Sequence, residues 1–342
     1  MRIAVDVMGG DNAPDAILKG CVQALELLQA DDHLVLFGPK PLLEDMLAER
    51  GVRDPRIILE HTSQVISMED SPAKAVREKL DSSLVRMTIA GSRKAANPCD
   101  VVLSAGNTGA CVTAAIMHMR RLPGVHRPGI AVTVPAFHGP VVLCDAGANP
   151  EPRPSHLWQY GLMAETYAKR VLGIDNPRVA LMNIGSEEGK GGDLVKEARK
   201  LFKITPGLNY VGYIEGRGFF NGEADVVVTD GFVGNTVLKM AEGLAKSIFS
   251  AIAQELFAYD PELMLKFEPV VKQIYAKNDY HEHGGAPLLG VNGAFMCAHG
   301  SSEARTIRAA IRNSRQYVTR GVNDAIVERL AQVSHIAEPE PA

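Results

Sequence analysis

The chain has 342 residues, of which 46% are hydrophobic and 22% charged, a composition typical of a folded globular protein with one large core or two domains. Its 36 basic and 40 acidic side chains give a net charge of −4, which argues against nucleic acid as a partner, because nucleic-acid-binding proteins carry a basic excess. The five cysteines lie in apolar surroundings without CxxC or CxxH spacing, so we expect reduced structural thiols and no metal site.

The first 120 residues predict neither a secretion signal nor a membrane-spanning segment. No basic segment leads into a long apolar one, so no signal peptide is expected. Residues 101–119 lack Asp, Glu, Lys and Arg over nearly a membrane-spanning length, but the turn at 106–109 interrupts them. Exposed turn backbone is costly in lipid, so we predict a buried strand, turn and helix here.

Short apolar runs alternate with segments of helical periodicity along the chain, which indicates βα units around a mainly parallel sheet. We predict a three-layer α/β/α fold in a single domain over residues 1–335, followed by a flexible tail at 336–342. The predicted strands are residues 2–7, 33–37, 56–60, 100–103, 130–134, 140–145, 178–184, 209–214 and 225–229.

Six glycine-rich turns follow strand-like ends, where open α/β sheets place their ligand clefts. Glycine lets backbone approach a ligand, and the helix starts that follow add partial positive charge. Tight packing would explain one such turn, but six together predict an anion pocket. They are DVMGGDNAP from Asp6, SAGNTGA from Ser104, DAGANP from Asp145, NIGSEEGKGG from Asn183, TDGFVGN from Thr229 and AHGSS from Ala298.

Two nucleotide-binding fingerprints do not fit these turns. GSEEGKG at 185–191 has the wrong spacing for a P-loop and lacks the Ser or Thr that would hold magnesium after the lysine. VMGGDNAP is not a GxGxxG motif. Nucleoside triphosphate binding is therefore not expected, and a dinucleotide site would rest on architecture alone.

Residues 244–277 read as two apolar-rich helical stretches broken at Tyr259-Asp260-Pro261, so we predict a protruding helical hairpin. Its apolar stripe is wide for a surface helix, and it suits a dimer bundle, a membrane surface or ordinary core packing. The stripe consists of one helical face and two neighbouring phenylalanines: Leu244, Ile248, Ile252, Leu256, Phe249 and Phe257.

The motifs RIAVDVMGGDNAP, SAGNTGA, DAGAN, NIGSEEGKG, DVVVTDGFVGN and AHGSS, in this order, resemble the PlsX family of bacterial acyl-ACP:phosphate acyltransferases over nearly the whole chain. The resemblance implies transfer of a fatty acyl group from an acyl carrier protein (ACP) thioester to inorganic phosphate, giving acyl phosphate for phospholipid synthesis without a cofactor. It implies a catalytic domain similar to phosphotransacetylase and to isocitrate dehydrogenase-type folds. It also implies a cytoplasmic homodimer, partly peripheral at the inner face of the membrane, with a membrane glycerol-3-phosphate acyltransferase as a further partner.

Inorganic phosphate fits the predicted anion pocket and can attack a thioester itself, so no enzyme nucleophile is required. By the resemblance, Lys190 and Asn235 are the catalytic residues. The Lys190 ammonium would steady the oxyanion or protonate the departing sulfur, and Asn235 would donate to the carbonyl or to phosphate. The alternatives are a solvated loop lysine and, for Asn235, the N-cap of the helix that follows.

The other predicted contacts to phosphate or substrate lie in the glycine turns: Gly106, Asn107, Thr108, Gly109, Asp6, Gly9, Gly10, Asp11, Asp230 and His299. For Asp6, Asp11 and Asp145 a structural role is favoured, because an extra carboxylate beside phosphate is repulsive. His299 either donates to phosphate or serves as a cap or core residue at a helix start. Because ACP is acidic, basic side chains near the cleft could guide its docking, the alternative being a solvated charged face. The residues predicted for docking are Arg77, Lys79 and Arg86.

Two other classes of function stay open. A decarboxylating dehydrogenase of related fold would need an adenine-binding loop and a carboxylate cluster for magnesium, and neither is evident. A scaffold that senses phosphate or lipid at the membrane surface is compatible with the same pocket and hairpin.

Overall fold

The computed structural model describes residues 1–136, 138–277 and 284–337, so most of the predicted tail, 338–342, lies outside the described residues. Within them, an eleven-stranded sheet has the order β3-β2-β1-β4-β11-β10-β5-β6-β9-β7-β8. The strands are β1 (Arg2–Asp6), β2 (His33–Gly38), β3 (Ile57–His61), β4 (Val101–Ser104), β5 (Gly129–Val134), β6 (Val141–Cys144), β7 (Val179–Met182), β8 (Tyr210–Ile214), β9 (Val226–Val228), β10 (Ala286–Leu289) and β11 (Ala294–Cys297).

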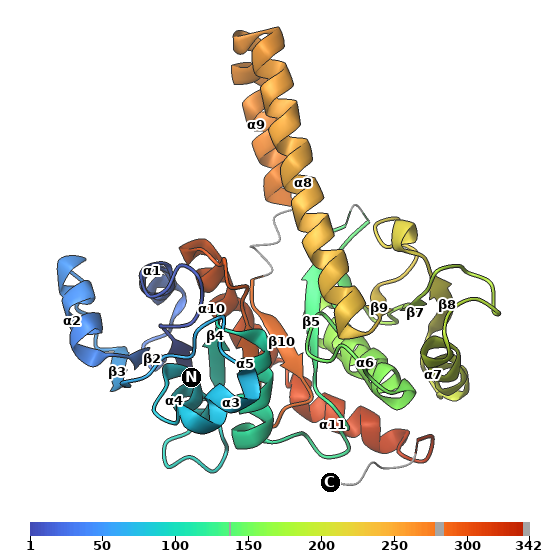
Figure 1. The fold of residues 1–342 in the computed structure, drawn as a ribbon, viewed down its shortest axis with the longest axis horizontal. Coiled ribbons are helices and arrows are strands. Elements are labelled where there is room, and N and C mark those ends of the chain that lie inside the picture. The colour runs from blue at the N-terminus through green and yellow to red at the C-terminus, as the bar shows by residue number, and fades with distance from the viewer. Residues whose placement is uncertain (137, 278–283, 338–342) are drawn as a thin grey trace.

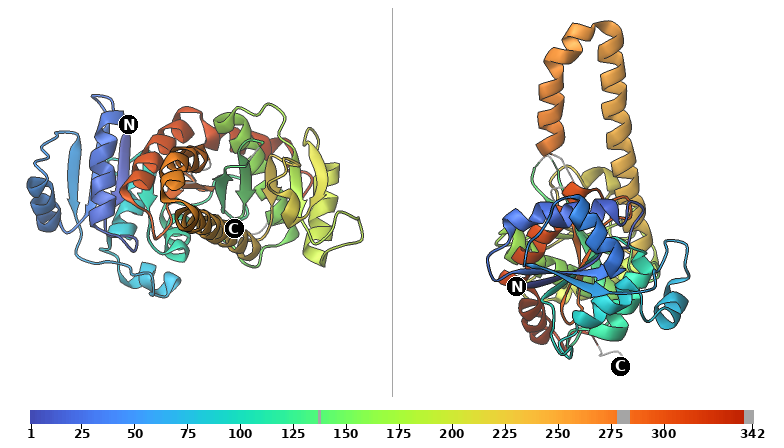
Figure 2. Two further views of the ribbon diagram at one scale, coloured as in Figure 1. Left: turned by 90° about the horizontal axis from the view of Figure 1, so that it is seen from above. Right: turned by 90° about the vertical axis from the view of Figure 1, so that its left-hand side faces the viewer.

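Helices cover both faces of this sheet, and a hairpin stands out from the body (Figures 1 and 2). The predicted three-layer α/β/α fold with a protruding hairpin is confirmed. The helices are α1 (Asp15–Ala24), α2 (Lys40–Glu49), α3 (Pro72–Glu78), α4 (Ser83–Ala90), α5 (Thr108–Ala114), α6 (Pro154–Tyr167), α7 (Asp193–Ile204), α8 (Gly231–Tyr259), α9 (Pro261–Lys277), α10 (Ala304–Thr319) and α11 (Val322–Gln332).

The inner strands are mainly apolar because both faces of the sheet are buried there, whereas the edge strand β3 carries exposed Glu60 and His61. Successive side chains point to opposite faces, so Ile3 and Val5 of β1 join the core under α1, α2, α6, α7, α10 and α11. Ala4 between them joins a second core under α3, α4 and α5. The nine predicted strands match β1 to β9 to within two residues at each end, whereas β10 and β11 lie outside the predicted runs.

The direction of the sheet reverses in its middle. β3, β2, β1, β4 and β11 are mutually parallel, and so are β6, β9, β7 and β8. Between these two sets β10 is antiparallel to both β11 and β5, and β5 is antiparallel to β6. The turns after β1, β4 and β11 therefore form one group and those after β6, β7 and β9 another. The expectation that all six turns share one edge is wrong, because these antiparallel pairs separate the two parallel sets.

The hairpin breaks at the expected place, since α8 ends at Tyr259 and α9 begins at Pro261. Its first helix starts at Gly231 rather than near residue 244, because the Asp230 carboxylate accepts the N–H of Val233 at 2.9 Å and caps the helix there. The first turns of α8 therefore lie on the body. The later part of α8 and helix α9 form the protruding part of the hairpin, which we call the arm. Within the described residues, no helix combines the length and the apolar content that a bilayer-spanning segment needs.

Helices α1 and α10 pack closely at Gly20. A Cβ atom at this position would lie 2.6 Å from the carbonyl oxygen of Ala304 and 2.6 Å from the Cβ of Ile307. We predict that Gly20→Val lowers the free energy of unfolding by about 1–3 kcal/mol, because the two helices must move apart. Urea unfolding measures this, with Gly216→Ala as the control, since nothing lies within 4 Å of a Cβ there. Equal stability of the Gly20 variant and the wild type would contradict the close packing.

Candidate functional site

A cavity of about 550 Å³ lies on the face of the sheet that carries α5, over β5 and between α5 and the base of α8. Figure 1 shows the arrangement of these three elements. Ile130, Val132 and Val134 line it from β5, because alternate residues of a strand share a face. Helix α8 forms the opposite wall. Most of the lining is apolar, and polar side chains reach it from Thr108, Asn235, His299 and Ser301. The cavity therefore takes residues from both groups of glycine turns.

The turns after β1 and β4 are held together by a buried carboxylate. Asp6 accepts the hydroxyl of Ser104 at 2.8 Å and the N–H of Met8 at 3.2 Å. Burial raises the pKa of Asp6, although these hydrogen bonds oppose the shift. A Cβ at Gly9 would lie 2.5 Å from the Asp6 carboxylate, so this glycine serves packing. Asp6 and Gly9 thus build the turns rather than contact the cavity.

The turn after β11 joins the same group. The N–H of Asp11 donates to the carbonyl of Gly300 at 2.8 Å, and Gly10 lies against Ala105 and Gly300. His299 is exposed and lines the cavity. The Nδ1 atom of His299 lies 2.8 Å from the Ser301 hydroxyl. Of the residues predicted in this turn and in the turn after β1, His299 is the one that lines the cavity.

In the predicted phosphate turn at 106–109, the N–H of Gly106 and the side chain of Asn107 form hydrogen bonds within the protein. The N–H of Gly106 donates to the Ser104 hydroxyl at 3.0 Å. Asn107 caps α5 by accepting the N–H of Ala110 at 3.1 Å, and its amide nitrogen donates to the carbonyls of residues 68 and 70. A Cβ at Gly109 would lie 2.7 Å from a ring carbon of residue 72, so Gly109 is a packing position. In this turn Thr108 lines the cavity, whereas Asn107 is outside the lining and its side chain is hydrogen-bonded within the protein. A phosphate contact at this turn stays a prediction.

A second buried carboxylate organises the turn after β6. Asp145 accepts the backbone N–H groups of Ile130, Gly147, Ala148 and Asn149 at 2.6–3.2 Å. Burial raises its pKa from 3.8 to about 6, although these four hydrogen bonds oppose the shift. The structural role favoured for Asp145 on sequence grounds agrees with these contacts.

The start of α8 sits directly on this turn. The N–H of Gly231 donates to the Asn149 carbonyl at 2.8 Å, and a Cβ at Gly234 would lie 2.0 Å from the Asp145 carbonyl oxygen. Asn235 follows in the second turn of α8, with its side chain against Gly147 and facing the cavity. The alternative that Asn235 caps the helix is wrong, because Asp230 occupies that position.

Lys190 lies on the exposed loop after β7 and is outside the lining of the cavity. Asn183 shapes this loop by donating to the carbonyls of Gly185 and Lys190, each at 3.1 Å. Among the described residues that line the cavity, the lysine is Lys239 of α8, and Glu242 lies one turn further on. Lys239 and Glu242 are not among the site residues predicted from the sequence, because their spacing is typical of the polar side of an amphipathic helix.

Two of the three basic residues predicted for docking are paired within the chain. Lys79 donates to Asp70 at 2.5 Å and lowers the pKa of that carboxyl, and Arg86 pairs with Asp81 at 2.9 Å. Arg77 is exposed on α3. Within the described part of the chain, no group of three or more His, Cys, Asp or Glu side chains is placed to hold a metal ion.

Comparison with known proteins now gives the family. Residues 1–325 match the family model "Fatty acid synthesis protein". The chain belongs to this family. It is 44% identical to a phosphate acyltransferase of Clostridium perfringens over 93% of each chain. It is also 41% identical to a phosphate acyltransferase of Desulfitobacterium hafniense, over 99% of this chain and 100% of the relative. The resemblance seen in the motifs is confirmed, and these relatives are named as acyltransferases.

Solved structures with little sequence identity share the fold. A phosphotransacetylase from Streptococcus pyogenes aligns with a TM-score of 0.65 at 15% identity, over 93% of this chain and 94% of its own. A 4-hydroxythreonine-4-phosphate dehydrogenase from Klebsiella pneumoniae aligns with a TM-score of 0.53 at 11% identity, over 93% of this chain and 99% of its own. The expected likeness to phosphotransacetylases and to dehydrogenases of related fold is confirmed at the level of the fold.

Asp145 gives a prediction for stability against pH. Because its folded pKa of about 6 lies above its ordinary 3.8, the folded protein holds this proton more tightly than the unfolded chain does between about pH 4 and pH 6. Its contribution to the free energy of unfolding therefore falls by about 3 kcal/mol as pH rises through this window, and stays constant above it. Asp145→Asn removes this slope.

Urea unfolding of the wild type and the variant at several pH values from 4 to 7 measures the difference. Subtracting the two curves cancels the other carboxylates. A difference that does not change with pH would contradict the raised pKa.

Proposed function

We propose that the protein transfers a fatty acyl group from an acyl-ACP thioester to inorganic phosphate, giving acyl phosphate and free ACP for phospholipid synthesis. The cavity carries this proposal, because a mainly apolar lining with a few polar groups suits an apolar chain that ends in a reacting carbonyl. Membership of the fatty acid synthesis family, with relatives named phosphate acyltransferase, supports the choice.

In the proposed reaction a phosphate oxygen attacks the thioester carbonyl, the tetrahedral oxyanion collapses, the carbon–sulfur bond breaks and the sulfur of ACP takes a proton. Asn235, in the cavity wall, would donate its amide hydrogens to the oxyanion or to phosphate. Thr108 and His299 offer further donors for phosphate in the same lining. By the resemblance, Lys190 would supply positive charge or the proton for the thiolate, although it lies on the exposed loop after β7 and outside this lining. These steps use the chain's own residues and the two substrates.

The experiment incubates the protein with acyl-ACP in the presence and in the absence of phosphate and detects acyl phosphate by mass spectrometry. Release of free ACP that depends on phosphate, with acyl phosphate as product, is expected. A protein that binds lipid vesicles but turns over no thioester would favour the scaffold. Reduction of a nicotinamide cofactor without phosphate would favour the dehydrogenase.

We predict that Lys190→Ala folds normally and loses roughly two to four decades of turnover, the scale for a lost general acid or charge stabiliser. Steady-state kinetics with acyl-ACP and phosphate measure this, and circular dichroism checks the fold. Lys239→Ala is the matched comparison, because Lys239 is the lysine of the cavity lining. A folded Lys190→Ala protein with near-normal turnover, beside a large loss in Lys239→Ala, would transfer the role to Lys239.

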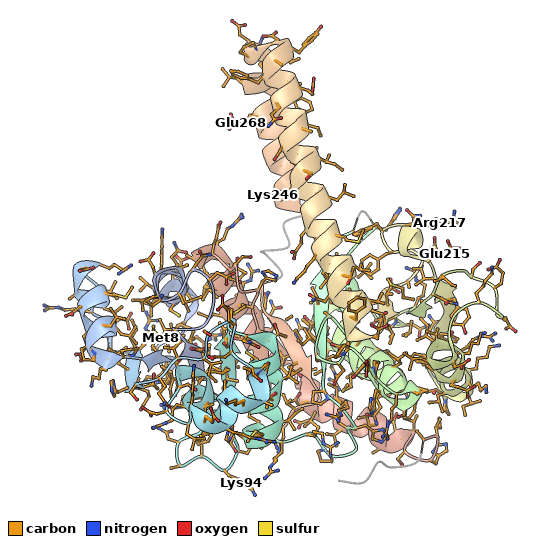
Figure 3. The ribbon with its side chains drawn as sticks, in the orientation of Figure 1. Met8, Lys94, Glu215, Arg217, Lys246 and Glu268 are labelled. Carbon is orange, nitrogen blue, oxygen red and sulfur yellow. The ribbon has the colours of Figure 1, made fainter. Side chains whose placement is uncertain are left out.

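We also propose that the arm of the hairpin mediates dimerisation or contact with the membrane surface. Figure 3 shows side chains standing out along both of its helices, from the level of Lys246 to that of Glu268. Phe257 and Ile252 are 60% and 38% exposed and lie outside the cavity lining, which contradicts the alternative of ordinary core packing for this part of the stripe. Leu244 and Ile248 of the same stripe line the cavity. Apolar area of this kind is normally covered by a partner or by lipid.

The double substitution Ile252→Glu and Phe257→Glu is expected to reduce dimerisation or vesicle binding and to leave the α/β body folded, because both side chains lie outside the three cores. Light scattering and vesicle flotation measure the two kinds of association. Ser250→Glu with Gln254→Glu is the matched control, since it adds the same charge at exposed polar positions of α8. Unchanged association in the apolar double variant would show that these positions form neither surface.

A further inference from the structure

The cavity is elongated along two elements that run beside each other. Its lining on β5 and the residues just after it extends from Ile130 to Ala136, and its lining on α8 extends from Asn235 to Phe249. At 3.3 Å per residue in the strand and 1.5 Å per residue in the helix, both walls are about 20 Å long. A space of this form suits an extended chain better than a compact ligand.

On helix α8, the residues that line the cavity form a row that runs from the body towards the arm. Leu238, Ala241, Ala245 and Ile248 recur at spacings of three and four, which places them in one row on the helix, and all four line the cavity. Asn235 stands at the end of this row that lies on the body, against the turn after β6, and Ile248 stands at the end nearest the arm. Lys239 and Glu242 lie on a neighbouring row of the same helix.

The two alanines in the middle of the row leave space where larger side chains would fill it. We infer that this row measures the length of the acyl chain, with the carbonyl at Asn235 and the methyl end towards Ile248, so that Ala241 and Ala245 determine which chain lengths are accepted. The inference rests on the proposed function, which places the reacting carbonyl at Asn235. It assigns a specificity role to side chains that take no part in the chemistry.

The order of the residues gives a graded test. Ala241→Leu lies nearer to Asn235 and should exclude all but short chains, whereas Ala245→Leu should exclude only the longer ones. Each methylene that no longer fits costs about fourfold in kcat/KM, so the ratio of kcat/KM for hexadecanoyl-ACP to that for octanoyl-ACP should fall at least tenfold in Ala245→Leu. In Ala241→Leu the decline should begin at shorter chains.

Ala251→Leu is the matched control, because Ala251 is exposed on the same helix and lies outside the lining. Ile248→Ala tests the far end with the opposite sign, since it lengthens the space and should raise the relative kcat/KM for octadecanoyl-ACP. Its control is Met240→Ala, which shortens an exposed side chain of the same helix outside the lining. The measurements use the full chain and a series from hexanoyl- to octadecanoyl-ACP with saturating phosphate.

The outcomes separate this inference from the proposed function. Suppose that the wild type shows phosphate-dependent turnover and that Ala241→Leu and Ala245→Leu keep its chain-length profile. This result overturns the role of the row in chain-length selection and leaves the proposed acyl transfer intact. The reverse order of cut-offs overturns the assigned direction of the chain. A wild type that turns over no acyl-ACP of any length defeats the proposed function itself, and the inference with it.

Discussion

The reversal of strand direction at β10, β5 and β6 is the constraint on which the site depends. Helix α5 covers one face of the first parallel set, and α8 covers the same face of the second set, but β5 lies between them. Its side chains on this face, Ile130, Val132 and Val134, line the cavity that forms between the two helices. Strands twist by about 20–25° at each pairing, so the four steps from β4 to β6 add up to about 90° and turn the two sets of strand ends relative to each other.

The buried carboxylates of Asp6 and Asp145 stabilise the turns at the ends of the two parallel sets of strands. Asp6 joins the turns after β1 and β4, and Asp145 holds the turn on which α8 is seated. Each is desolvated, and each collects hydrogen bonds from groups that would otherwise be unpaired in the interior. The glycines around them are needed because backbone or a carboxylate occupies the space of a Cβ, which is a packing requirement. Much of the motif pattern thus encodes how the loops lock together, and fewer of its residues face the cavity.

Helix α8 connects three parts of the molecule: the Asp145 loop, the cavity and the arm. Its first turns pack on the Asp145 loop, its middle walls the cavity, and its last turns form the exposed arm. Because hydrogen bonds run without a break along an α-helix, the wall and the arm belong to one stiff element. The position of the arm and the shape of the cavity are therefore set together.

Local signals in the sequence determined the nine strands β1 to β9, the break between α8 and α9 at Asp260, and the family, because each depends on residues close together in the chain or on motifs in a fixed order. The fold class followed from the same alternation of apolar runs and helices. The strands β10 and β11 are four residues each, one begins Ala-Pro, and their place in the sheet depends on distant partners.

Tertiary structure alone decided the direction of the sheet's two halves, and therefore which turns meet. It placed Asn235 and Thr108 in the cavity, engaged Asn107 and Gly106 within the protein, and left Lys190 on an exposed loop with Lys239 in the lining. No local pattern could decide these points, since burial and hydrogen-bond partners come from segments far apart in the chain.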